Sequence, residues 1–122
     1  MLKSLVAGWL VFVSLSFAEE SWTRFRGPNG SGVSPDSGFP STLDKAKALW
    51  RAPVRPGKSS PVLTPRHIFL TAHDQGRLYT QCFDRQTGKL LWEQFVEPRH
   101  SGVVNRLNQA AAPTPVTDGD NV

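Results

Sequence analysis

Cysteine is nearly absent from this sequence, since Cys82 is the only one among 122 residues. A single thiol cannot form an internal disulfide, so a small secreted domain held together by disulfide bridges is excluded. Cys82 lies between Gln81 and Phe83 in an apolar alternation. We therefore expect it to be a buried and unreactive thiol.

Runs of one charge are also missing. The 14 Lys and Arg side chains exceed the 10 Asp and Glu side chains by a modest net charge of +4, and the basic residues are scattered from Arg24 to Arg106. Proteins that track a phosphate backbone gather their basic side chains on one face or in one run. The sequence thus predicts no nucleic-acid partner.

No apolar run is long enough to span a bilayer. The longest, residues 5–17, falls short of the roughly 18 residues that a spanning helix needs. It follows the positive charge of Lys3 and ends at Ser16-Phe17-Ala18, which places small residues where a signal peptidase reads. We predict a signal peptide over residues 1–18, with a membrane anchor as the alternative. The mature chain is then expected in the periplasm or secreted, with no stable membrane span and no cysteine at the junction for a lipid anchor.

A leader rich in Pro and Gly, residues 19–47, follows the predicted signal peptide. Its glycines between Gly27 and Gly32 disfavour both helix and strand. Two interpretations remain open. Either Trp22 and Phe25 anchor the leader on a larger surface through their large apolar area, or the leader is flexible.

Segments of high β-propensity, separated by turn residues, fill the region from Ser59 to Glu97. Glycine ends each of two short turns, residues 73–76 and 84–88, where a tight reversal needs a positive φ. These features predict an all-β fold with an antiparallel meander of four strands, at residues 60–63, 67–72, 77–84 and 89–96.

Consecutive apolar residues at 68–70 and 90–92 predict strands that are covered on both faces. A single free sheet exposes one face, so this pattern favours sheets packed against one another. Solenoids of paired helices are excluded because the apolar residues lack a period of 3.6.

An internal repeat is visible in the sequence. Residues 48–54 are echoed by residues 89–96, with Trp50 and Trp92 lying 42 residues apart, and residues 60–64 return as residues 114–117. A period near 42 with four short strands is typical of a β-propeller blade.

Residues 84–92 carry a more specific likeness. Asp84, Thr87, Gly88, Lys89 and Trp92 match the Asp-x-x-Thr-Gly-Lys-x-x-Trp pattern, which resembles the signature of the pyrroloquinoline-quinone-like (PQQ-like) propeller repeat. The opening of the leader, residues 22–32, is similar to that of exported bacterial members of the family. The Gly-His and Trp-Asp pairs of WD40 repeats are absent.

This resemblance implies blades of four antiparallel strands in an incomplete propeller. Residues 48–122 would contain a closing strand at 49–54, one full blade and the start of the next, as the N-terminal piece of a longer protein. Asp84 would accept hydrogen bonds from turn amides, and Trp92 would pack between blades. An independent small β domain is disfavoured, because one blade leaves apolar faces and open edges.

Catalytic and metal-binding residues are not predicted. The histidines His67, His73 and His100 lack the close spacing of a ligand set. Residues 118–121 place Asp118 and Asp120 as calcium loops do, but without the remaining frame, so a turn is expected. The sequon at Asn29 is expected to be unmodified in a bacterial protein.

The connection at residues 97–112 would join one blade to the next on the face where propellers usually bind ligands, and long connections often carry function. It is a candidate site for a protein or small-molecule ligand, and a solvated surface loop is the alternative. Its potential donors are Arg99, His100, Asn105, Arg106 and Asn108.

The resemblance favours a non-catalytic propeller of the cell envelope that scaffolds or binds, similar to propellers that assist outer-membrane protein assembly, with no cofactor in this chain. The alternative is the N-terminal part of a quinone-dependent alcohol or sugar dehydrogenase, which would use PQQ and calcium. Many such alcohol dehydrogenases carry adjacent cysteines beside the quinone, whereas Cys82 stands alone.

Overall fold

The computed structural model describes residues 21–42, 44, 47–99, 108 and 110–122. The predicted signal peptide lies outside this part of the chain. So do His100, Asn105 and Arg106 of the candidate binding loop.

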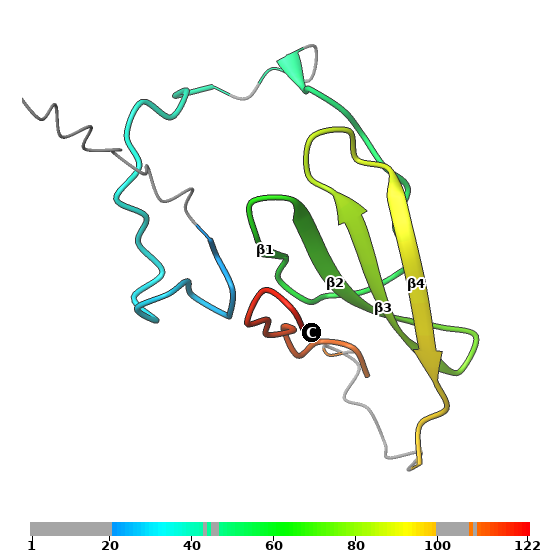
Figure 1. The fold of residues 1–122 in the computed structure, drawn as a ribbon. Coiled ribbons are helices and arrows are strands. Elements are labelled where there is room, and N and C mark those ends of the chain that lie inside the picture. Colours follow the sequence, from blue (N-terminus) through cyan, green and yellow to red (C-terminus); the bar gives the residue numbers. More distant parts are fainter. Residues whose placement is uncertain (1–20, 43, 45–46, 100–107, 109) are drawn as a thin grey trace, which may run out of the picture.

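The described residues form one antiparallel sheet of four strands, arranged in the same order as in the sequence (Figure 1). This confirms the all-β class and the meander. The sheet does not close on itself, because β1 and β4 are its two edges. The strands are β1 (Val62–Leu63), β2 (His67–Asp74), β3 (Arg77–Asp84) and β4 (Leu90–Val96).

The first hairpin turn is tighter than the sequence predicts. Asp74 pairs with Arg77, so only Gln75 and Gly76 lie between β2 and β3. Both have a positive φ, 47° and 80°, as the two-residue turns that match the twist of a hairpin require. Strand β2 therefore continues through His73 and Asp74, which were predicted as turn residues.

The second turn follows the prediction for residues 84–88. The Asp84 carboxylate accepts hydrogen bonds from the backbone N–H of Gln86 (3.1 Å) and of Thr87 (2.8 Å), and from the Thr87 hydroxyl (2.7 Å). The Gly88 N–H donates to the Asp84 carbonyl at 2.9 Å, with φ 70° at Gly88. The side chain of Asp84 thus holds the reversal between β3 and β4.

Strand β4 differs from the prediction. Cys82 pairs with Trp92 and Phe83 with Leu90, so Leu91 has no partner on β3 and forms a β-bulge. The expected cover on both faces is present on β2, where residues 68–70 are buried or half-buried. It is absent on β4 among the described residues, where the exposed apolar side chains are Leu90, Leu91, Trp92, Phe95 and Val96.

Buried apolar side chains lie on both faces of the sheet, and one cluster of them shares a face with Cys82. Val62, Phe69 and Cys82 are buried together, and the ring of Trp92 lies 6.0 Å from that of Phe69. Paired residues of antiparallel strands share a face, which explains why Phe69, Cys82 and Trp92 meet there.

The C-terminal segment lies alongside β2 (Figure 1). The Thr71 hydroxyl donates a hydrogen bond to the Pro113 carbonyl at 2.8 Å, and Ala111 is buried. The Thr117 N–H donates to the carbonyl of Thr23 at 3.0 Å, which ties this segment to the leader. Residues 114–117, which echo residues 60–64, form no strand with the described residues.

The start of the leader is anchored on the sheet. Trp22 and Leu63 exchange two backbone hydrogen bonds of 2.8 Å, which extends the edge at β1. The Trp22 ring also covers Gly27, where an added Cβ would lie 2.6 Å from it. The anchoring role predicted for Phe25 is wrong, since that side chain is 62% exposed.

Candidate functional site

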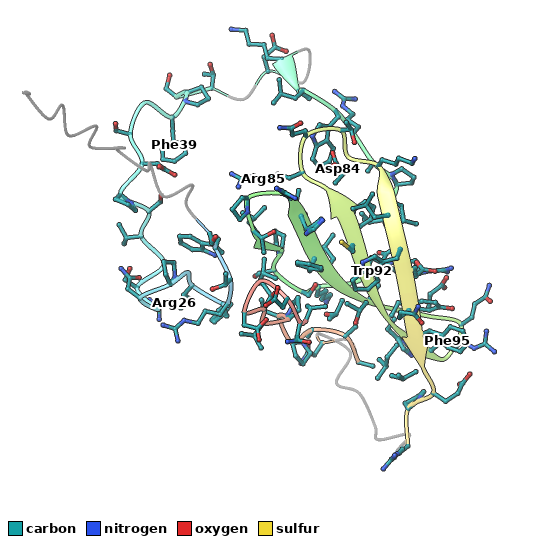
Figure 2. The ribbon with its side chains drawn as sticks, in the orientation of Figure 1. Arg26, Phe39, Asp84, Arg85, Trp92 and Phe95 are labelled. Carbon is teal, nitrogen blue, oxygen red and sulfur yellow. The ribbon has the colours of Figure 1, made fainter. Side chains whose placement is uncertain are left out.

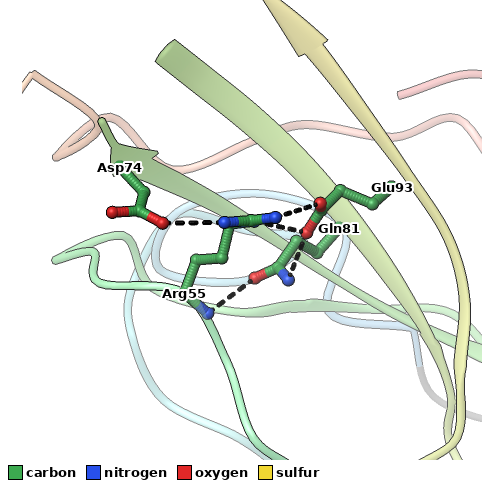
Figure 3. A network of polar contacts seen from close by, with 4 residues as sticks. All are labelled: Arg55, Asp74, Gln81 and Glu93. Atoms are coloured by element: carbon green, nitrogen blue, oxygen red, sulfur yellow. Dashed lines mark hydrogen bonds and ion pairs between the residues drawn. The ribbon is translucent and has the colours of Figure 1, made fainter. Parts of the chain in front are cut away.

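A charged cluster of the described residues lies on the face of the sheet opposite Cys82. Residues 50–59, which we call the strap, pass β4, β3 and β2 on their way to β1 (Figure 1). Arg55 of the strap bonds both carboxylate oxygens of Glu93 at 2.8 Å, through Nε and one terminal nitrogen, and its other terminal nitrogen bonds Asp74 at 2.7 Å (Figure 3). A guanidinium fork held bidentately has a fixed position as well as strong charge-assisted bonds.

A buried amide completes this cluster. Gln81 is 3% exposed, and its side chain accepts a hydrogen bond from the Arg55 backbone N–H (3.2 Å) while donating one to Glu93 (2.8 Å). Both ends of the amide are therefore satisfied, as burial requires. The Arg55 guanidinium carbon also lies 4.1 Å from the centre of the Tyr79 ring, in a cation–π contact.

Strand register explains how these residues come together. Tyr79 and Gln81 are two residues apart on β3, so their side chains share a face. Glu93 on β4 pairs with Gln81 on β3, and Asp74 is the last residue of β2. The sheet thus presents two carboxylates with an aromatic ring between them, and Arg55 reaches them from the strap.

The electrostatics of the cluster keep its members charged. The hydrogen bonds from Arg55 hold the pKa of Glu93 below its usual range. Those same bonds to Glu93, with further help from Asp74, raise the pKa of Arg55. At neutral pH this arrangement neither gives nor takes a proton readily. The cluster therefore has a structural role, which is to hold the strap on the sheet.

Of the predicted donors of the binding loop, the structure describes Arg99 and Asn108, and both are exposed. A groove of about 250 Å³ lies nearby, between the end of the sheet and the segment that follows the loop. Its apolar lining includes Leu78, Phe95, Val96, Ala110, Ala111 and Pro113.

The histidines that the structure describes both lie on β2. His67 begins the strand, with its ring 5.9 Å from that of Phe69, and His73 lies near its end. Within the described ranges, no group of three or more His, Cys, Asp or Glu side chains is placed to hold a metal ion.

Asp118 behaves as a turn residue. Its carboxylate accepts hydrogen bonds from the backbone N–H groups of Asp120 (2.9 Å) and Asn121 (2.7 Å). These bonds, led by that of Asn121, lower the pKa of Asp118. At Asn29, the side-chain oxygen accepts bonds from the N–H (3.0 Å) and the hydroxyl (2.7 Å) of Ser31.

Cys82 is buried, as predicted, with 1% of its surface exposed. Burial also raises the pKa of its thiol. Since the thiolate is the reactive form, this environment makes the thiol a poor nucleophile at neutral pH.

The Arg55 cluster was not foreseen from the sequence. The pairing of Gln81 with Glu93 depends on the bulge at Leu91, because a regular ladder would shift the partners by one residue. Arg55 lies between the leader and β1, where no periodic pattern places it. The sequence features that could have indicated the cluster are an acidic residue near the end of β2 and another in β4.

Comparisons with models of known protein families, with curated proteins and with solved structures find no match. Among the residues that the structure describes, no helix is long and apolar enough to cross a membrane.

Proposed function

We propose that the sheet is one blade of an exported PQQ-like β-propeller, which acts in the cell envelope as a non-catalytic scaffold or binding protein. One observation carries this proposal. The Asp84 carboxylate organises the turn before β4, Trp92 of the same motif packs on Phe69, and both belong to a four-stranded meander (Figure 2).

The exposed side chains of β4 support the blade interpretation. Trp92 is 37% exposed and Leu90 is 45% exposed although both belong to an ordered strand. Apolar surface gathered on an edge strand usually marks a contact with another element. In a propeller, neighbouring blades provide that contact.

Residues 49–54 support the proposed closing strand. They form no strand with the described residues, and Leu49 is 96% exposed. Trp50 nevertheless ties this segment to the turn before β4, because its indole N–H donates to the Arg85 carbonyl at 3.0 Å. An extended segment held beside a sheet without pairing to it remains available to a different blade.

The Arg55 cluster favours a structural role over a catalytic one. Its carboxylates and its guanidinium are engaged with one another, and Glu93 is held in its charged form. Catalytic acids and bases usually have a pKa near the working pH. We therefore assign this cluster to the architecture of the blade, and we place ligand binding on the face that carries the loop at residues 97–112.

The test uses the full-length protein with two defined probes. A photo-crosslinking residue is placed at Arg99, and an unfolded outer-membrane barrel protein is offered as the ligand, with the same crosslinker at the exposed leader residue Asp36 as the control. We expect crosslinks from position 99 and none from position 36. Equal crosslinking at both positions would contradict a binding face at the loop.

The second probe addresses catalysis. The same protein is mixed with PQQ, calcium, a primary alcohol or sugar, and an artificial electron acceptor. The proposal predicts no reduction of the acceptor above the rate without protein. Reduction that depends on both the quinone and the alcohol would replace the scaffold with a dehydrogenase.

A further inference from the structure

The strap is attached to the sheet at several points along its length. At its start, Trp50 bonds the Arg85 carbonyl at 3.0 Å. At its end, the Ser59 hydroxyl donates to the Thr71 carbonyl and accepts from the Thr71 N–H, both at 3.0 Å. Between these ends lies the Arg55 cluster.

These attachments differ in their dependence on charge. The bonds of Trp50 and Ser59 join neutral groups, so protonation of a carboxylate does not break them directly. The middle of the strap depends on the ion pairs of Arg55 with Asp74 and Glu93. Two neutral bonds also lie there, from the His73 N–H to the Pro56 carbonyl at 2.9 Å and from the Arg55 backbone N–H to the Gln81 side chain at 3.2 Å.

We propose that the Arg55 cluster is an acid-sensitive clamp: when Glu93 loses its negative charge, the middle of the strap leaves the sheet and uncovers Tyr79 and Gln81, while both ends of the strap stay attached. The released surface would be the face of β3 that Arg55 now covers. Neither the propeller nor the scaffold role is needed for this inference.

The groups that face Arg55 come from each strand that the strap crosses. They are Asp74 on β2, Tyr79 and the neutral Gln81 on β3, and Glu93 on β4. Arg77 is a second cation beside Tyr79, with its own ion pair to Glu97 at 2.8 Å. Loss of the charge on Glu93 removes the bidentate partner and leaves Asp74 as the one remaining ion-pair partner of Arg55 in this cluster. The Arg55 side chain is already 34% exposed, so a single ion pair near the surface holds it only weakly.

The direction of the pH effect follows from the lowered pKa of Glu93. A carboxylate whose pKa is lower in the clamped state stabilises that state above its ordinary pKa of about 4.3. The stabilisation is lost as the pH falls through the lowered value. The strap is therefore clamped at neutral pH and opens in acid.

Hydrogen exchange of single amides in the full-length protein tests the clamp at neutral pH. The variant Glu93→Gln removes the charge and keeps the shape. We expect at least tenfold faster exchange at the His73 amide, whose partner is on the strap, and unchanged exchange at the amides of the central strand β3. Glu97→Gln, which breaks the exposed ion pair of Arg77, is the matched control and should change neither.

Two outcomes would overturn the clamp. Either His73 stays as protected in Glu93→Gln as in the wild type, or β3 loses protection together with His73, which means that the whole sheet opens. If the variant does not fold, the wild type is compared at pH 7 and at an acid pH where a carbon NMR titration shows Glu93 to be protonated, with the rates corrected for intrinsic exchange. Protection of His73 that is equal at both pH values then refutes the proposal.

Discussion

At the scale of single residues, Gly88 matters both for the turn before β4 and for the packing of Trp50 against that turn. Its φ of 70° lies where side chains are strained. A Cβ there would also lie 2.3 Å from a ring carbon of Trp50. Gly76 has a similar φ of 80° but has nothing within 4 Å of the added atom. A comparison of the two glycines therefore distinguishes the cost of backbone strain from the cost of a clash with Trp50 of the strap.

We predict that Gly88→Ala destabilises the fold more than Gly76→Ala. Strain alone costs roughly 1–2 kcal/mol at either position, and the clash with Trp50 adds about 1–3 kcal/mol at Gly88. Urea unfolding of both variants, followed by circular dichroism, measures the difference. Equal losses would mean that Trp50 does not pack on Gly88 in solution.

Asp84 supplies a second residue-scale prediction. The hydroxyl and backbone N–H of Thr87, followed by other turn groups, lower the pKa of this carboxyl. The stability it contributes is therefore fully present above its ordinary pKa of about 3.9 and is lost as the pH falls through the lowered value. We expect a carbon NMR titration of Asp84 to show that lowered pKa.

Thr87→Val serves as the matched variant for Asp84. It removes the hydroxyl donor at 2.7 Å and keeps the backbone donor at 2.8 Å, so the pKa of Asp84 should rise part of the way toward its ordinary value. A pKa that is unchanged in this variant would show that the hydroxyl bond does not form.

At the scale of elements, the meander was the most predictable part. Strand β3 occupies the predicted residues, because its apolar alternation is bounded by turn signals at both ends. Strand β1 is shorter than residues 60–63 and includes only Val62–Leu63. A strand needs a partner along its whole length, and β1 pairs only with Phe69 and Ile68 on β2.

The contacts between distant segments were less predictable. The bridge between Trp22 and Leu63 and the clamp at Arg55 each join residues that no local pattern relates. Phe25 and Trp22 are both aromatic, yet only Trp22 lies against the sheet. Composition indicates which side chains can anchor a segment, whereas the backbone pairing of Leu63 decides which one does.

Strand β4 gives the prediction at this scale. It is an edge strand with exposed apolar side chains, and such edges tend to pair with other chains. We expect residues 21–122, purified alone, to self-associate. The double variant Leu91→Lys and Val96→Lys should lower light scattering and leave the circular dichroism of the sheet unchanged.

Phe39→Lys is the control for β4. Phe39 is 69% exposed and lies on the leader, away from the sheet (Figure 2), so its replacement should leave the scattering of the protein high. A monodisperse monomer of the unmodified residues 21–122 would contradict the prediction. It would mean that the exposed edge strand β4 does not pair with other copies of the chain.

At the scale of the whole molecule, the two tryptophans of the repeat have related positions. Trp92 lies on one face of β4 against Phe69, and Trp50 packs on Gly88 at the turn that leads into β4. Both thus gather around the motif at residues 84–92. The repeat in the sequence relates the two tryptophans by their spacing. It does not predict that Trp50 contacts the turn that precedes Trp92.

A crystal structure of the full-length protein tests the central claim, that this sheet is one blade of a propeller. The account predicts several four-stranded sheets around an axis, with Trp92 covered by a neighbouring blade and residues 49–54 paired as the outer strand of another. A full-length protein in which Trp92 and Leu90 stay in solvent, or in which β4 continues into a barrel or a sandwich, would contradict it.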